Sequence, residues 1–170
     1  MADDLADNAA IATSSQNLHD AINARIKKGV PTFFKLEAQL PTQGRTNIPL
    51  ASSDSMWVVL KTYASGGENE LHAHPHEDHT FVILQGAAKF YGPNKEERIA
   101  KAGEGVLLPA GTFYWFHVVS EEQLVMLRIG AQAGEGDRFH RIDTEGKLMQ
   151  GDDPANKQVP LILSDTWYGR

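Results

Sequence analysis

The chain of 170 residues contains no cysteine. Disulfide bridges and thiolate-based zinc or iron–sulfur sites are therefore excluded, and a metal ion would have to be held by histidine, carboxylate, tyrosine or backbone oxygen. Long apolar runs are also lacking, and no stretch approaches the roughly 20 residues of a membrane helix. We therefore expect a protein that does not associate with membranes.

Basic residues are in the minority, because 16 Lys and Arg face 22 Asp and Glu for a formal net charge of −6. Nucleic-acid binding needs a basic face, so we expect no nucleic-acid partner. The first residues, MADDLADNAAIATSS, lack the basic and apolar regions of a secretory signal peptide. We expect a cytoplasmic protein whose length is typical of one domain.

The N-terminal third divides into two parts. Residues 1–15 are small and polar and predict a flexible tail. Residues 16–56 predict a helix and a leading strand region, with Ser15 or Asn17 as the helix cap, Gly29 as its end and a strand over residues 30–39. We interpret residues 41–54 as turn-rich. The helix is indicated by apolar residues at four-residue steps, namely Leu18, Ile22 and Ile26.

The middle of the chain consists of short β-branched and aromatic segments separated by Gly and Pro. This pattern is typical of an antiparallel sandwich or barrel and predicts an all-β fold. Residues 131–170 form a C-terminal extension, whose last segment, 161–170, is apolar and aromatic and is expected to dock on the domain or on a partner chain. The predicted strands are 56–64, 79–86, 87–92, 98–105, 106–111, 113–119 and 123–131.

Four of the seven histidines lie in one stretch, HAHPHEDH. Residues two apart on a strand point to the same face, so His72 and His74 can reach one metal ion. His79 opens the next predicted strand, and an antiparallel neighbour would bring it back beside them. Neutral imidazole is a common ligand of divalent transition metals.

The remaining residues of this stretch lie in the predicted turn. We interpret His76 as an exposed loop residue, with a substrate-facing base as the alternative. Glu77 and Asp78 are interpreted as solvated loop residues that could otherwise orient a ligand imidazole.

The spacing of Gly66, His72, His74, His79 and Gly86 resembles the first motif of the cupin family, with His79 where the family usually has Glu. Sixteen residues further on, Gly103, Pro109 and Gly111 are similar to the second motif, whose histidine position falls on Tyr114 and whose asparagine position falls on Val118. The resemblance covers residues 57–130 as the barrel core. It implies a cupin-type double-stranded β-helix, a jelly-roll barrel, with a short N-terminal helix.

The family's usual site has three His and one Glu, so the resemblance implies metal ligands at His72, His74, His79 and Tyr114. In one interpretation three histidines bind the ion and Tyr114 is a hydrogen-bond donor or weak ligand; in a second, Tyr114 binds as phenolate; in a third, no metal binds. We expect a divalent ion, Fe(II) first, with Zn, Ni, Mn or Cu as alternatives. Without Glu the ligand set would be neutral and the ion would keep its full charge.

Strand parity does not decide which side chains line the pocket. Arg128 faces in if Leu124 and Met126 do, and Lys61 faces in if Trp57 does. His117 has the opposite parity to Tyr114 and should face away from the site. An aromatic-lined cavity would suit a small aromatic or dicarbonyl-like substrate.

The leading hypothesis is a metal-dependent oxidoreductase of dioxygenase type acting on such a molecule. The alternatives are a metal-dependent lyase, isomerase or hydrolase, in which the ion polarises a carbonyl and Tyr114 is the catalytic acid or base, and a non-catalytic small-molecule-binding protein. The resemblance also implies a homodimer, with the apolar strand VPTFFKL as the exchanged element.

Overall fold

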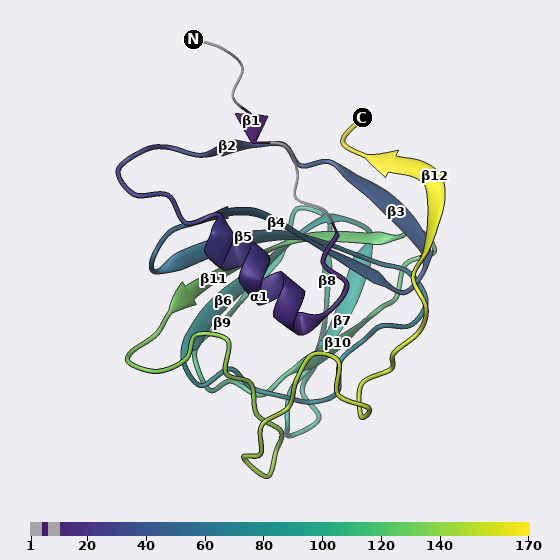
Figure 1. Cartoon of the computed structure of the whole chain (residues 1–170). Coiled ribbons are helices and arrows are strands. Elements are labelled where there is room, and N and C mark those ends of the chain that lie inside the picture. The colour runs from purple at the N-terminus through teal and green to yellow at the C-terminus, as the bar shows by residue number, and fades with distance from the viewer. Residues whose placement is uncertain (1–4, 7–10) are drawn as a thin grey trace.

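A computed structural model describes residues 5–6 and 11–170 (Figure 1). Of the predicted N-terminal tail, residues 1–4 and 7–10 lie outside the described residues. The short strands β1 (Leu5–Ala6) and β2 (Phe33–Phe34) pair in parallel. The other elements are α1 (Ser15–Ala24), β3 (Ala38–Gln43), β4 (Arg45–Ser52), β5 (Met56–Tyr63), β6 (Glu77–Gln85), β7 (Ala87–Tyr91), β8 (Glu97–Lys101), β9 (Gly105–Leu108), β10 (Trp115–Val118), β11 (Leu124–Gln132) and β12 (Ile162–Tyr168).

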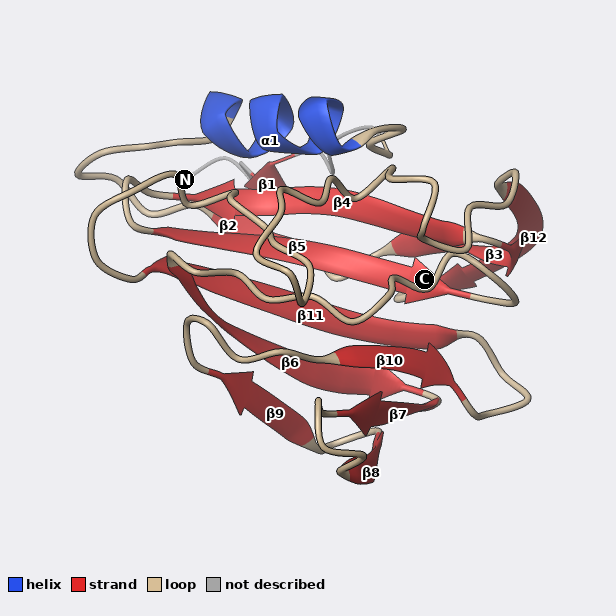
Figure 2. Cartoon of the chain, turned by 90° about the horizontal axis from the view of Figure 1, so that it is seen from below, coloured by secondary structure: helices blue, strands red, loops and turns tan. Residues whose placement is uncertain are grey.

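Two antiparallel sheets face each other across the core (Figure 2). The larger sheet has the strand order β4-β5-β11-β6-β9 and the smaller one β10-β7-β8. Neighbouring strands in space are often distant in sequence, as in the β11–β6 and β6–β9 pairs. The predicted fold class is confirmed: the chain is all-β, with the double-stranded β-helix or jelly-roll arrangement and one short helix among the described residues. The two sheets remain separate hydrogen-bonded units and do not close into one continuous barrel.

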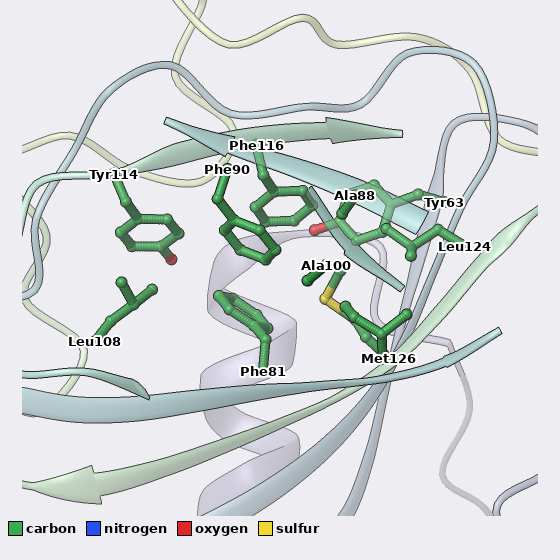
Figure 3. Close-up of a cluster of buried hydrophobic side chains, with 11 residues drawn as sticks. Tyr63, Phe81, Ala88, Phe90, Ala100, Leu108, Tyr114, Phe116, Leu124 and Met126 are labelled. Atoms are coloured by element: carbon green, nitrogen blue, oxygen red, sulfur yellow. The ribbon is translucent and has the colours of Figure 1, made fainter. Parts of the chain in front are cut away.

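Aromatic side chains fill the space between the two sheets (Figure 3). Phe90 and Phe116 point from the smaller sheet toward Phe81 on the larger one. The Phe81 and Phe116 ring centroids are 5.5 Å apart in an edge-on arrangement, which contributes about 0.5–1.5 kcal/mol beyond simple burial. Because Tyr114 belongs to the same cluster, the hydrophobic core and the candidate site share one wall.

The other face of the larger sheet is covered by the pair β3–β12. Apolar residues of β3, β4, β5 and β11 form a second buried cluster there, with Tyr168 of β12 packed against it. The segment 161–170 therefore docks on the domain itself, through antiparallel pairing of β12 with β3.

The helix α1 lies beside β4 (Figure 2) and begins one residue after its cap. The cap is Ser14, whose hydroxyl accepts from the Asn17 backbone N–H at 3.1 Å, so the predicted caps Ser15 and Asn17 are wrong. The helix also ends at Ala24, before the predicted Gly29. Its buried Ile22 packs on Trp57 and Val59 of β5. No helix in the described part of the chain is long and apolar enough to cross a membrane.

The segment predicted to be turn-rich, residues 41–54, instead contains β4. Gly44, with φ 81°, makes the tight turn between β3 and β4, and Ser53 and Asp54 lie in the turn between β4 and β5. Pro49 lies within β4 at a register shift opposite β5, and β4 is an edge strand of its sheet. An edge position with a bulge tolerates proline because no ladder hydrogen bond from its nitrogen is needed.

Candidate metal centre

Strand β6 carries two of the residues that form the candidate site. Its inward-facing residues alternate along the strand, so Glu77 and His79 point to the same side as Phe81. Glu77 is only 1% exposed, and the interpretation of this residue as a solvated loop side chain is therefore wrong. The reason is that β6 begins at Glu77, two residues earlier than predicted.

Three side chains, His74, Glu77 and His79, converge with their ligand atoms all within 4.8 Å of one another. His74 Nδ1 lies 3.3 Å from Glu77 Oε2, and His79 Nδ1 lies 3.7 Å from Glu77 Oε1. Two imidazoles and a carboxylate are a ligand set compatible with a divalent metal ion. The cluster therefore contains a carboxylate, which the expected set of three histidines and Tyr114 lacks.

His72 lies beside this cluster and is not one of its three members. Its ring centroid is 5.2 Å from that of His74. The Nδ1 atom is 2.6 Å from the Glu70 carbonyl oxygen, which can only accept, so Nδ1 carries the proton and Nε2 keeps its lone pair.

Tyr114 stands opposite His72 in a short antiparallel bridge. The His72 N–H donates to the Tyr114 carbonyl at 3.2 Å, and the Tyr114 N–H donates to the His72 carbonyl at 3.0 Å. The tyrosine ring centroid is 4.6 Å from the His72 ring and 5.1 Å from the His79 ring. Burial raises the pKa of Tyr114, which favours the neutral phenol over the phenolate.

The ring nitrogens of the three histidines fit a cation. His72 Nε2, His74 Nδ1 and both nitrogens of His79 are buried and have no hydrogen-bond partner among the described residues. Burial is the main cause that lowers the pKa of each of these histidines, well below the ordinary value for His72 and His74. Neutral imidazoles with unpartnered lone pairs are suited to metal binding, and buried polar atoms otherwise rarely stay unpartnered.

Arg128 faces into the site on the same side of β11 as Leu124 and Met126, which is one of the two arrangements that strand parity allows. Its Nη2 atom lies 2.6 Å from Oε1 and 2.5 Å from Oε2 of Glu77. Both groups are buried, so the guanidinium offsets the carboxylate charge and fixes its orientation.

Gly130 on β11 leaves the space that Glu77 occupies. It pairs with His79 on one side and with Trp57 on the other. A Cβ atom at this position would collide with the Glu77 carboxylate and with the Trp57 indole. Glycine is thus required here because the Glu77 and Trp57 side chains approach the backbone closely, and not because of an unusual backbone angle.

The two other histidines near the motifs lie away from the cluster. His76 is half-buried and stacks on His140, with ring centroids 5.8 Å apart. His117 is on the opposite face of β10 from Phe116 and stacks with Tyr91 at 5.4 Å. The parity prediction for His117 is confirmed.

A cavity of about 250 Å³ is lined by His72, His74 and Glu77. The predicted aromatic wall is present, but basic side chains share the lining, so the cavity is less apolar than expected. Lys61 faces in with Trp57, as in one of the two parity alternatives. The aromatic residues are Tyr63, Phe81, Tyr114, Phe116 and Phe139, and the basic ones are Arg45, Lys61, Arg128 and Arg141.

One wall of the cavity comes from the C-terminal extension, residues 131–170. The buried Asn156 organises this wall, because its Oδ1 accepts from the Glu70 N–H at 2.9 Å and from Arg141 Nη2 at 3.2 Å. A backbone pair between Ala73 and Ile142 adds a second connection. The extension thereby holds the His72 segment and Arg141 together.

Residues 59–130 match a family model described as a cupin domain. This match confirms the resemblance to the cupin family over residues 59–130, which lie within the jelly-roll fold. The matched range begins within β5 and ends within β11, so it includes the histidine cluster and Tyr114. No curated protein matches the sequence.

Several solved structures resemble parts of the chain. The cupin domain of Schizosaccharomyces pombe Cnp3 is 19% identical, with 52% of this chain and 61% of that chain covered and a TM-score of 0.48. An uncharacterized conserved protein with a double-stranded β-helix domain from Klebsiella pneumoniae subsp. pneumoniae is 18% identical, with 70% and 84% covered and a TM-score of 0.48. KdgF from Halomonas sp. is 19% identical, with 52% and 81% covered and a TM-score of 0.47. The chain thus spans less than two thirds of the Cnp3 domain structure.

Proposed function

We propose that the protein is a metal-dependent enzyme of dioxygenase type that binds Fe(II) through His74, Glu77 and His79. The observation that carries the proposal is the convergence of two imidazoles and one carboxylate, of which His74 and Glu77 line the pocket. Such a ligand set with open positions is typical of non-haem iron(II) oxygenases. We assign His72 as a further ligand through its unpartnered Nε2 atom.

Iron(II) would supply the activation of O₂ beside a small aromatic or dicarbonyl-like substrate. The Glu70 carbonyl fixes the ring of His72, and Arg128 holds both oxygens of Glu77. Tyr114, kept as a neutral phenol by burial, is suited to donate a hydrogen bond to a substrate oxygen. Phe81 and Phe116 line the same cavity and limit the access of water.

Metal analysis tests the proposal first. Protein loaded anaerobically with Fe(II) as the only transition metal is expected to contain about one iron ion per chain, since two imidazoles and a carboxylate suit this ion. His79→Ala is expected to lose this metal, whereas the neighbouring His76→Ala should keep it because His76 stacks on His140 outside the cluster. A wild-type protein without stoichiometric metal would sink the proposal.

Oxygen consumption tests the reaction class. The iron-loaded protein is expected to consume O₂ with at least one member of a panel of catechols and dicarbonyls, and His79→Ala should not. A metal-loaded protein that consumes no O₂ with any of them would refute the dioxygenase assignment.

The second candidate is a metal-dependent lyase, isomerase or hydrolase. It is favoured by the position of Tyr114, a buried neutral phenol whose ring is 4.6 Å from His72 and 5.1 Å from His79. There the tyrosine would act as a proton donor or acceptor at a substrate whose carbonyl is polarised. Substrate turnover under anaerobic conditions distinguishes this candidate, because a dioxygenase would be inactive without O₂.

We also propose a cytoplasmic homodimer that uses the segment VPTFFKL. Val30 is 60% exposed and Phe33 is 65% exposed, which leaves apolar surface available on this segment. Light scattering after gel filtration is expected to give a dimer mass for the wild type and a monomer mass for Phe33→Ser. A monomeric wild type would refute the dimer, and cell fractionation tests the location.

A further inference from the structure

We propose that the pocket selects a small carboxylic acid, whose carboxylate binds to Lys61 and Arg141 with Arg45 adding positive charge. The role of this acid as a substrate rests on the proposed function, but its binding does not require the metal. The observation behind the proposal is that three cations line the cavity without a carboxylate partner among the described residues.

Lys61 has the fewest polar contacts of the three cations. It lies on β5 and is 8% exposed, and no hydrogen bond or ion pair joins its ammonium group to the described part of the chain. Its only specific contact is with the Tyr63 ring, whose centroid is 5.5 Å from Nζ. A buried ammonium group without an anionic partner is costly, and burial accordingly lowers the pKa of Lys61 well below its ordinary value. A negatively charged ligand at this position on the cavity wall would favour the charged form of Lys61.

Arg141 and Arg45 are held by neutral acceptors. Arg141 is 6% exposed, and its Nη2 atom donates to Asn156 Oδ1 at 3.2 Å, while its buried Nε has no partner. Arg45 donates to Asn69 Oδ1 at 2.5 Å and to the Gly151 carbonyl at 2.8 Å. These bonds hold both guanidinium groups in place without offsetting their charges.

The carboxylates of the cavity wall do not balance these cations. Glu77 is already paired with Arg128, and Asp152 is exposed at the rim. The wall therefore keeps an excess of positive charge next to the histidine cluster, although the whole chain carries a net charge of −6. A ligand with negative charge fits the wall better than a neutral one.

The free donors on the wall suit a small oxyanion. Lys61 has three N–H donors, and the Nε–H and the Nη1 hydrogens of Arg141 have no hydrogen-bond partner among the described residues. Donors on a lysine and on a guanidinium can together hold the two oxygens of a carboxylate, and inorganic phosphate is the competing oxyanion in the test. A cavity of about 250 Å³ restricts the acid to a small molecule.

The test uses metal-free protein, so that direct chelation of a metal cannot account for binding. The buffer contains no chloride. Acetate, pyruvate, succinate and benzoate are compared by calorimetry and thermal shift with acetamide, succinamide, benzamide and inorganic phosphate. At least one acid is expected to bind and raise the unfolding temperature, and its amide should not. Lys61→Met is expected to weaken binding about tenfold or more, since a hydrogen bond to a charged group is lost.

The control variants separate binding from folding. Lys101→Met removes an exposed lysine on β8 and should bind the acid like the wild type. Lys61→Arg keeps the charge and should retain most of the affinity. If Lys61→Met does not fold, Arg141→Gln takes its place, with the same expected loss of affinity.

The proposal is overturned if no acid binds, if an amide or phosphate binds as tightly, or if the folded variant at Lys61 or Arg141 keeps full affinity. Metal content is measured on the same preparations. Acid binding by a protein that takes up no metal would contradict the proposed function and leave this inference standing. The reverse result, with normal iron content but no acid binding, would contradict this inference alone.

Discussion

At the residue scale, the site depends on Glu77 more than on any one histidine. Its carboxylate meets Arg128 at 2.5 and 2.6 Å and lies within 3.7 Å of nitrogens of both His74 and His79. Gly130 provides the room for it. Glu77 therefore offers a candidate ligand atom to the cluster and a counter-charge to a buried arginine at the same time.

Replacement of this residue by an isosteric neutral one should affect both roles. Glu77→Gln is expected to lower the metal content strongly and to reduce the free energy of unfolding by about 3–5 kcal/mol, because Arg128 would stay buried without an anion. Metal analysis and urea denaturation of the metal-free protein measure the two effects. Asp78→Asn, at the exposed neighbour, should change neither. Loss of stability with full metal content would show that Glu77 is only a counter-ion.

Substitution of Tyr114 tests whether this residue is a metal ligand or a hydrogen-bond donor. Tyr114→Phe removes only the hydroxyl and is expected to leave the metal content at the wild-type level, because burial favours the neutral phenol. Turnover in the assay that detects wild-type activity should fall about 100-fold, in keeping with loss of a positioned proton donor. A variant that lost its metal would instead establish Tyr114 as a ligand.

The sequence predicts part of this site well. Alternation along a strand places His72 with His74, and the motif spacing correctly brings His79 and Tyr114 to them. Glu77 is missed because the strand that carries it was expected to begin two residues later. Arg141 is missed for another reason: it reaches the pocket through Asn156, and no local pattern reveals contacts between segments so far apart.

At the scale of elements, the pocket depends on segments outside the matched cupin range. The start of α1 and the loop that carries Asn156 both line the cavity or hold its walls. Strands with clear alternation, such as β5 and β6, are predicted close to their true bounds. β4 is missed because Gly44 and Pro49 resemble turn residues, and only its edge position makes the proline acceptable.

The attachment of α1 should depend on a single buried side chain. Ile22 is 1% exposed and packs on Trp57 and Val59, so Ile22→Ala is expected to cost about 2–5 kcal/mol of unfolding free energy. Urea denaturation measures this loss. Gln16→Ala, on the exposed side of the helix, should change stability by less than about 0.5 kcal/mol. Equal effects of the two substitutions would contradict the packing described for the helix.

At the scale of the whole molecule, the fold places buried polar side chains together at one end of the core, where they can contact one another. The two sheets enclose an aromatic core, and one end of that core is replaced by histidines, Glu77 and Arg128. The all-β fold follows from the regular short strands, and the jelly-roll architecture is what the resemblance to the cupin motifs implies. The sequence left a sandwich and a barrel as alternatives, and neither that choice nor the pairing of β12 with β3 could be decided from it, because both depend on pairing between distant segments.

The buried histidines should make the metal-free protein sensitive to acid. Burial lowers the pKa of His72, His74 and His79, whereas in the unfolded chain a histidine has a pKa of about 6.5. Below that pH the unfolded chain binds protons that the folded protein does not, so the free energy of unfolding falls as the pH falls. Urea denaturation between about pH 7.5 and about pH 5.5 should show this decline, and His72→Gln should reduce its slope. A flat profile in the wild type would contradict the burial of neutral imidazoles.

The central claim is that a metal ion binds between His74, Glu77 and His79. Anomalous X-ray scattering from crystals of the iron-loaded protein, recorded at the iron absorption edge, tests it most directly. The account predicts one strong peak among these three side chains, within bonding distance of the Glu77 carboxylate and of a nitrogen from each histidine. Absence of a peak from fully loaded crystals, or a peak held by other residues, would contradict it.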